Sequence, residues 1–197
     1  MRNHALKVGF ILLVTGLIII GFALISRSGL EGLIKAEGWE VEWYYINEYG
    51  VFGDMIGTTS YPVKFRFESV SFKGVDEMFD FKASMTINLL KDLTVRFEAG
   101  GRHHIILKVD GKTIIDFWGA ANKYSDAENV PLEAGIHRLE LEYYVFHKAG
   151  GRTPWVLFDM NVYEYDMLTK LAIIGDVIMC IGSVVSMMNI IIKRKTK

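Results

Sequence analysis

The chain has 197 residues, a net charge of −1 and one cysteine, Cys180, so an intramolecular disulfide is excluded. Its mean hydropathy of +0.24 is high for a chain in which 23% of the residues are charged. The apolar residues gather at the two ends and the charged residues in the middle. This segregation favours one domain between two membrane segments.

The first apolar run covers residues 8–25, is uncharged and is long enough to cross a bilayer at about 1.5 Å per helical residue. A cleaved signal peptide is the alternative, and the basic start with Arg2 and Lys7 fits both interpretations. The run is longer than a usual signal-peptide core, and no Ala-x-Ala cleavage site follows it. We therefore expect a retained transmembrane helix.

The second apolar run covers residues 171–192 and is followed by the basic tail 193–197. Basic residues without any acid in both tails place both termini in the cytoplasm, by the positive-inside rule, and the middle of the chain outside. The expected organisation is a tail, a helix, a connector, an extracytoplasmic β domain, a second helix and a basic tail: residues 1–7, 8–25, 26–37, 38–165, 171–192 and 193–197.

Small residues in both apolar runs predict close contact with another helix, within this chain or in a second protein. Asp176 lies about five residues, roughly 8 Å, inside the outer end of the second run, so its carboxylate can reach the headgroups. The small residues are Thr15, Gly16, Gly21, Gly175, Gly182, Ser183 and Ser186.

Between the runs, apolar and polar residues alternate with period two, which indicates half-buried strands. Strands spaced by about 8 to 12 residues, with glycine-containing turns, predict a mainly β domain, an antiparallel β-sandwich or barrel. The expected strands are 38–46, 62–72, 79–89, 94–98, 105–109, 112–117, 136–146 and 155–163, whereas 47–61 and 119–131 are expected to be loops.

The Asp110-Gly111 pair lies between two β-prone runs and predicts a hairpin with a type I′ turn, because both positions then need positive φ. The Gly100-Gly101 pair predicts a second reversal. Together they predict a three-stranded meander that begins with residues 94–98.

The hairpin at 105–118 and the stretch 132–144, which contains Ala134-Gly-Ile-His137, follow each other in an order that resembles the protective-antigen-type PA-14 domain. The resemblance covers about residues 38–164. It implies a β-sandwich module, often carbohydrate-binding, of the kind found in adhesins, glycosidases and toxins. In lectin members a consecutive aspartate pair holds calcium. Residues 98–104 here offer one carboxylate instead, so we expect no metal ion and no cofactor.

Tryptophan side chains are candidate platforms for a sugar, with packing in the core as the alternative for each of Trp39, Trp43, Trp118 and Trp155. Trp118 is the leading candidate because it opens a polar stretch. His103 and His104 are neighbours on a strand and point to opposite faces, so they do not share an ion. The predicted ligand-binding residues are Trp118, Arg102, His103, Asp110 and Asp116.

The sequence contains no nucleophile elbow, phosphate loop or dinucleotide fingerprint, so we expect a non-catalytic protein. The first hypothesis is a membrane-anchored module on the cell surface that binds a cell-envelope glycan or a protein partner. The alternative is a structural subunit of a membrane or envelope assembly. The expected partners are membrane lipid, a glycan, and another membrane protein or a second copy, but no nucleic acid. A large apolar patch would favour assembly, whereas a groove with aromatic and polar side chains would favour glycan binding.

Overall fold

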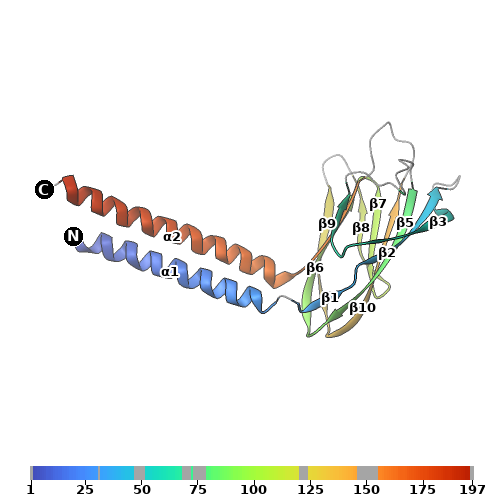
Figure 1. The fold of residues 1–197 in the computed structure, drawn as a ribbon, viewed down its shortest axis with the longest axis horizontal. Helices are drawn as coiled ribbons and strands as arrows, with labels where there is room; N and C mark the ends of the chain where they lie inside the picture. The colour runs from blue at the N-terminus through green and yellow to red at the C-terminus, as the bar shows by residue number, and fades with distance from the viewer. Residues whose placement is uncertain are drawn as a thin grey trace. The chain divides into compact units, whose positions relative to one another are not determined.

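The computed structural model describes residues 2–30, 32–46, 52–67, 72, 79–119, 124–145 and 155–195. The chain divides into a helical unit, Met1–Glu31 with Glu164–Lys197, and a β unit, Gly32–Tyr163. Figure 1 shows the two helices of the first unit and the two layers of strands in the second.

The helical unit consists of α1 (Arg2–Ser28) and α2 (Tyr163–Lys195). Both predicted apolar runs lie within these longer helices, and each helix is long and apolar enough to span a membrane. The helices run in opposite directions, so the start of α1 lies beside the end of α2 (Figure 1). Large apolar side chains remain exposed along both, such as Phe10, Ile18 and Ile173.

The two helices approach closely where glycines meet. A Cβ atom on Gly16 would lie 2.7 Å from the carbonyl oxygen of Gly175, and one on Gly182 would lie 2.7 Å from the carbonyl oxygen of Gly9. Such distances exclude any side chain, because real Cβ atoms do not approach a backbone oxygen so closely. Pairing within the chain is therefore confirmed for Gly16, Gly175 and Gly182.

One of the predicted small residues, Gly21, does not take part in this contact. Gly21 has no atom within 4 Å of its Cβ position. The Ser183 hydroxyl donates to the carbonyl of Met179 in its own helix at 2.9 Å. On α1 the contact instead follows a seven-residue spacing through Gly9, Gly16 and the buried Ala23.

The β unit contains two antiparallel sheets, which confirms the predicted mainly β class and is consistent with a sandwich. The seven-stranded sheet has the order β3-β2-β5-β10-β7-β8, with β1 also paired to β5, and the four-stranded sheet has the order β4-β11-β6-β9. The strands are β1 (Ile34–Ala36), β2 (Trp39–Ile46), β3 (Phe52–Tyr61), β4 (Phe65–Phe67), β5 (Phe79–Leu89), β6 (Leu93–Gly101), β7 (His104–Val109), β8 (Lys112–Trp118), β9 (Ser125–Leu132), β10 (Gly135–Tyr144) and β11 (Val156–Val162).

The core lies between the sheets and is rich in aromatic rings. Trp39 of β2 meets Phe158 of β11 edge to face at 4.8 Å, so the contact joins the two layers. Trp43 packs against Phe81 at 5.4 Å, and its indole nitrogen donates to the Thr59 hydroxyl at 2.8 Å. Trp39 and Trp43 are each only 1% exposed. These two tryptophans therefore pack in the core and are not platforms for a ligand.

The Asp110-Gly111 turn has the predicted type I′ character, with φ of 50° and 77°. The Asp110 carboxylate also ties this turn to the start of β10. One oxygen accepts the backbone N–H of Arg138 at 2.8 Å, and the other lies 2.7 Å from His137 Nδ1. The second ring nitrogen of His137 lies 2.9 Å from the carbonyl of Glu133. The two segments that carry the sequence resemblance therefore lock to each other.

The predicted three-stranded meander is wrong. β6 continues through Gly100 and Gly101 and pairs with β9 and β11, whereas β7 and β8 belong to the other sheet. Arg102 and His103 therefore carry the chain from one sheet to the other, and the glycine pair does not make a hairpin turn. A reversal inside one sheet and a crossing between two sheets need similar residues, so the sequence does not separate them.

Two segments expected to be loops contain strands, β3 and β9. Both are edge strands and are paired on one side only, which explains why they carry polar residues and glycine instead of an apolar alternation. The predicted strand 62–72 is observed at β4 and as a single bridge at Phe72, and its residues 68–71 lie outside the described part of the chain. Residue 146 of the predicted strand 136–146 also lies outside that part.

Candidate functional site: a groove on the seven-stranded sheet

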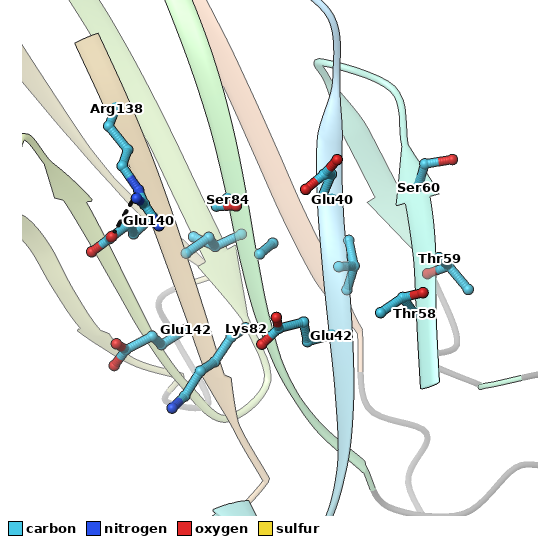
Figure 2. Close-up of a pocket in the computed structure, with 13 residues that line it drawn as sticks. Glu40, Glu42, Thr58, Thr59, Ser60, Lys82, Ser84, Arg138, Glu140 and Glu142 are labelled. Carbon is cyan, nitrogen blue, oxygen red and sulfur yellow. Dashed lines mark ion pairs between the residues drawn. The ribbon is translucent and has the colours of Figure 1, made fainter. Parts of the chain in front are cut away.

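The outward face of the seven-stranded sheet carries an open groove of about 630 Å³ across β2, β3, β5 and β10 (Figure 2). A second hollow of about 870 Å³ continues from it toward β1. The two share four lining residues: Glu40, Ser60, Ser84 and Arg138. A trough of this extent can accommodate an extended ligand of several units.

The walls of the groove repeat one short motif. Residues 40–44 of β2 and residues 140–144 of β10 both read Glu-x-Glu-x-Tyr, and the two strands flank β5 on opposite sides. We call these six side chains the twin ladder: Glu40, Glu42, Tyr44, Glu140, Glu142 and Tyr144.

The two halves of the twin ladder lie in register across β5. Ser84 is opposite both Glu40 and Glu140, and Lys82 is opposite both Glu42 and Glu142. Because side chains alternate along a strand, the four carboxylates all face the groove. Figure 2 shows them on either side of Lys82 and Ser84.

Hydrogen bonds within each half fix the tyrosines. The Tyr44 hydroxyl donates to Glu42 at 2.5 Å, and this bond raises the pKa of Tyr44 to about 12. The Tyr144 hydroxyl donates to Glu142 at 2.7 Å, and burial followed by this bond raises the pKa of Tyr144. Both phenols therefore stay protonated near neutral pH and act as donors.

Three basic side chains lie among the carboxylates. The Lys108 ammonium donates to Glu142 at 2.8 Å, and the Arg138 guanidinium lies 3.0 Å from Glu140. Burial alone would raise the pKa of Glu142, but the bonds from Lys108 and Tyr144 outweigh it, so the pKa is lowered and the group is ionised. The Lys82 ammonium lies over the Phe52 ring, 4.3 Å from its centroid.

Asp80 lies on the same side of β5 as Lys82 and is completely buried. One carboxylate oxygen accepts the backbone N–H of Val145 at 2.8 Å, and the other has no hydrogen-bond partner among the described residues. Burial raises the pKa of Asp80 to about 6, and the bond from Val145 lowers it only in part. A buried carboxylate that ionises near neutral pH thus lies at the Tyr44 end of the groove.

A continuous row of rings crosses the sheet at this end. Phe52 lies between Tyr44 and Tyr144, with centroid distances of 5.0 Å and 4.7 Å. His104 stacks on Tyr144 at 5.4 Å and on Trp118 at 4.0 Å. The row ends at Trp118, which is 57% exposed. It forms an aromatic platform from β2 to β8.

Four of the five predicted ligand-binding residues lie around the end of this row. Asp116 Oδ1 is 2.6 Å from Nε2 of His104, the ring that stacks on Trp118. The backbone N–H of Gly119, directly after Trp118, donates to the carbonyl of His103 at 3.0 Å. The Arg102 backbone N–H donates to the carbonyl of Trp155 at 3.1 Å. His103 is half-buried, and burial followed by the nearby Arg102 charge lowers its pKa.

The fifth predicted residue, Asp110, lies at the opposite end of the β7–β8 hairpin. Both of its carboxylate oxygens bond to β10. Asp110 therefore belongs to the contact between the hairpin turn and the start of β10, which we call the turn lock, and does not lie beside Trp118. The structure does not bring it together with the other four.

Residue-by-residue reasoning missed the twin ladder, although the sequence carried a signal for it. The repeated Glu-x-Glu-x-Tyr places three polar side chains on one face of each strand. Among the described residues, no group of three or more His, Cys, Asp or Glu side chains is arranged to hold a metal ion. The site therefore combines carboxylates that accept hydrogen bonds with flat aromatic faces next to them.

No protein-family model matches the chain, and no curated protein sequence matches it. Solved structures share the fold. A β-glucosidase from Kluyveromyces marxianus aligns with a TM-score of 0.52 and 13% identity over 68% of this chain and 17% of its own. An anti-sigma factor domain-containing protein from Clostridium clariflavum aligns with a TM-score of 0.50 and 18% identity over 65% of this chain and 42% of its own.

A PA14 sugar-binding domain from an RTX adhesin aligns with a TM-score of 0.47 and 16% identity over 65% of this chain and 91% of its own. At these identities the alignments with the β-glucosidase and the anti-sigma factor protein show a shared β fold. This chain spans less than half of the length of the β-glucosidase and of the anti-sigma factor protein.

Proposed function

We propose that the chain is a membrane-anchored, non-catalytic module of PA-14 type that binds a cell-envelope glycan on the outward face of its seven-stranded sheet. The observation that carries this proposal is the groove lined by the four glutamates of the twin ladder, together with the aromatic row that ends at Trp118 and lies next to the groove on the same face of the sheet. Sugars present apolar C–H faces and many hydroxyls, so aromatic rings beside carboxylates suit them.

The surface of the β unit favours glycan binding over assembly. In the described part of the β unit, the large exposed apolar side chains come from different turns and strands and include Tyr45, Met55, Leu90, Trp118, Tyr124 and Ile136. Isolated apolar side chains are normal on a soluble surface, and they do not require a protein partner. The groove instead combines a concavity with converging polar groups, which is typical of a small-molecule site.

The helical unit supports anchoring in a membrane. Two antiparallel apolar helices with exposed apolar side chains are suited to lipid. If both helices span the membrane, both ends of the chain lie on the same side of it. With the basic tails inside, the β unit lies outside the cytoplasm. Proteolysis tests this: protease added to intact cells should cleave the β unit, and digestion only in inside-out vesicles would contradict the topology.

Glycan binding is tested with the full-length chain in mild detergent or nanodiscs on a glycan array. Trp118→Ala should lower the signal of any bound glycan about twofold to twelvefold, because a lost aromatic contact is worth about 0.5 to 1.5 kcal/mol. Tyr124→Ala is the matched control. Tyr124 is 65% exposed and directly precedes β9 of the other sheet, so removal of its ring should leave binding unchanged.

An unchanged glycan profile for Trp118→Ala would remove the aromatic row from the site. Absence of any glycan signal, together with co-purification of one protein in fixed stoichiometry, would instead favour a structural subunit of a membrane assembly.

A further inference from the structure

The carboxylates of the groove are not balanced by the basic side chains around them. Glu140 pairs with Arg138, and Glu142 pairs with Lys108. In the part of the chain that the structure describes, Glu40 and Glu42 have no basic group within the 4.0 Å of an ion pair. Glu40 and Glu42 are therefore available to a positive charge on a ligand, and Lys82 of β5, opposite Glu42 in the register, is the basic group that shares this side of the groove.

Hydroxyl groups frame these two carboxylates and do not neutralise them. Ser84 of β5 and Ser60 of β3 are the cross-strand neighbours of Glu40, and Thr58 of β3 is a neighbour of Glu42. The carboxylates follow each other along a strand at about 7 Å, and the two halves of the twin ladder are about 10 Å apart across β5. This regular array suits a ligand with several positive charges at repeated spacings.

Lys82 shows how the groove holds an ammonium. It extends from β5 between Glu42 and Glu142 (Figure 2), and its Nζ lies 4.3 Å from the Phe52 ring centroid and 5.5 Å from the Tyr44 ring centroid. Carboxylates at the sides and aromatic faces beneath are the surroundings that bind organic cations.

A second observation, independent of the glutamates, points the same way. Asp80 is completely buried on the groove-facing side of β5, beside Tyr44 in the strand register, and one of its oxygens has no partner among the described residues. An unpartnered carboxylate in a buried site is costly unless a donor or a positive charge approaches it. Asp80 does not line the groove, but its negative charge next to Tyr44 in the register also favours a cation on this side of β5.

We propose that the groove selects amino sugars with free, protonated amines over their N-acetylated counterparts. This inference rests on the proposed glycan-binding function. Ammonium groups along a short oligosaccharide would pair with Glu40 and Glu42, while ring faces lie on the aromatic row. Acetylation removes the charge and adds bulk, so it should remove the pairing but not the stacking.

The test compares two glucosamine oligomers of equal length, one with free amines and one fully N-acetylated, binding to the full-length chain in nanodiscs of zwitterionic lipid. At low ionic strength we expect the free-amine oligomer to bind at least about tenfold more tightly than the acetylated one, since several weak ion pairs add together. Raising the salt concentration should weaken binding of this oligomer and leave the acetylated one nearly unchanged.

The double variant Glu40→Gln with Glu42→Gln keeps the shape of the groove and removes two charges. It should reduce the affinity for the free-amine oligomer about fivefold more than the affinity for the acetylated oligomer, which loses only hydrogen bonds from its hydroxyls to these carboxylates. Glu128→Gln is the control, because Glu128 is an exposed glutamate of β9 in the other sheet. It should change neither affinity.

Each contrary outcome has a distinct meaning. Equal affinity for the two oligomers, or no effect of the double variant, would overturn amine selection and leave glycan binding standing. Equal binding of an oligolysine with the same charge would overturn the sugar ligand, because charge alone would then suffice. Failure of both oligomers and of every glycan on an array would overturn the inference together with the proposed function.

Discussion

The two faces of the seven-stranded sheet are built from the same strands and do different work. The inward face of β2 carries Trp39, Val41 and Trp43, all at most 1% exposed. The outward face carries Glu40, Glu42 and Tyr44, which line the groove and its aromatic row. Neighbouring residues of the strand therefore belong alternately to the hydrophobic core and to the candidate site.

The difference between the faces separates stability from recognition. The inward face is closely packed, so a substitution there is expected to lower the unfolding free energy. The outward face keeps like charges close together and holds a buried carboxylate, Asp80, one oxygen of which has no partner among the described residues. These features cost stability and leave charged groups available to a ligand. Substitutions at neighbouring positions should therefore have opposite consequences.

The largest effect is expected for Trp43→Ala. This ring contacts Phe79 and Phe81 and donates to Thr59, so truncation leaves a large cavity and should cost about 3 to 5 kcal/mol of unfolding free energy. Its neighbour Tyr44→Phe loses one hydrogen bond to Glu42 and should cost about 1 kcal/mol or less. Urea unfolding followed by tryptophan fluorescence measures both, and similar losses would break the contrast between the faces.

The next effect concerns Asp80, an outward residue that is buried. Its folded pKa of about 6 is above the usual 3.8, so the folded state binds the proton more tightly than the unfolded state. This contribution to stability is present below about pH 4 and is lost as the pH rises through 6. Asp80→Asn should therefore raise stability at pH 7.5 by about 1 kcal/mol, because it removes a buried charge and keeps the acceptor for Val145.

Melting curves at pH 4.5 and pH 7.5 check this prediction. The advantage of Asp80→Asn over the wild type should shrink at the lower pH. Asp54→Asn, at an exposed position in β3, is the control and should show no such change. A variant that is less stable at pH 7.5 would show that the ionised carboxylate is compensated.

Much of this arrangement could be predicted from the sequence where the pattern was strong. The alternation in 39–46 and 79–89 located β2 and β5, and Asp110-Gly111 located the hairpin turn. The edge strands β3 and β9 were missed, because solvent on one side relaxes the demand for apolar residues. The sheet to which β6 belongs was also missed, since a glycine pair fits a turn and a crossing alike.

The candidate site was predictable only at its end. Trp118 stood out because a tryptophan opens a polar stretch, and the structure places it at the end of the aromatic row. The twin ladder depends on β2 and β10 pairing with the same strand, although their motifs are about 100 residues apart in the chain. Register of this kind is a property of the tertiary fold, so local patterns do not reveal it.

A smaller effect is expected at the turn lock. Burial alone would lower the pKa of His137, but its bonds to Asp110 and to the Glu133 carbonyl outweigh this and raise it above 6.5. The pKa of Asp110 is lowered below 3.8, mainly by its hydrogen bond with His137. The pair therefore stabilises the fold fully between about pH 4 and 6.5, and the contribution is lost as the pH rises through the folded pKa of His137.

Asp110→Asn should cost about 1 kcal/mol at pH 5.5, because the neutral amide still fits the positive φ but loses the charged partner. The cost should decrease at pH 8. Unfolding at both pH values checks the sign, and a cost that grows with pH would contradict it. Glycan binding should not change, since the lock lies away from the aromatic row.

The smallest effect on stability is expected for Glu40→Gln in the groove. This substitution tests the contrast between the two faces of the sheet most directly. Glu40 lies two residues before Glu42 on the same face and has no basic partner among the described residues, so Glu40→Gln relieves repulsion and removes no ion pair. Its unfolding free energy should stay within about 0.5 kcal/mol of the wild type or rise slightly at low salt. A loss above about 1 kcal/mol would mean that Glu40 supports the fold, and the outward face would then serve stability as the inward face does.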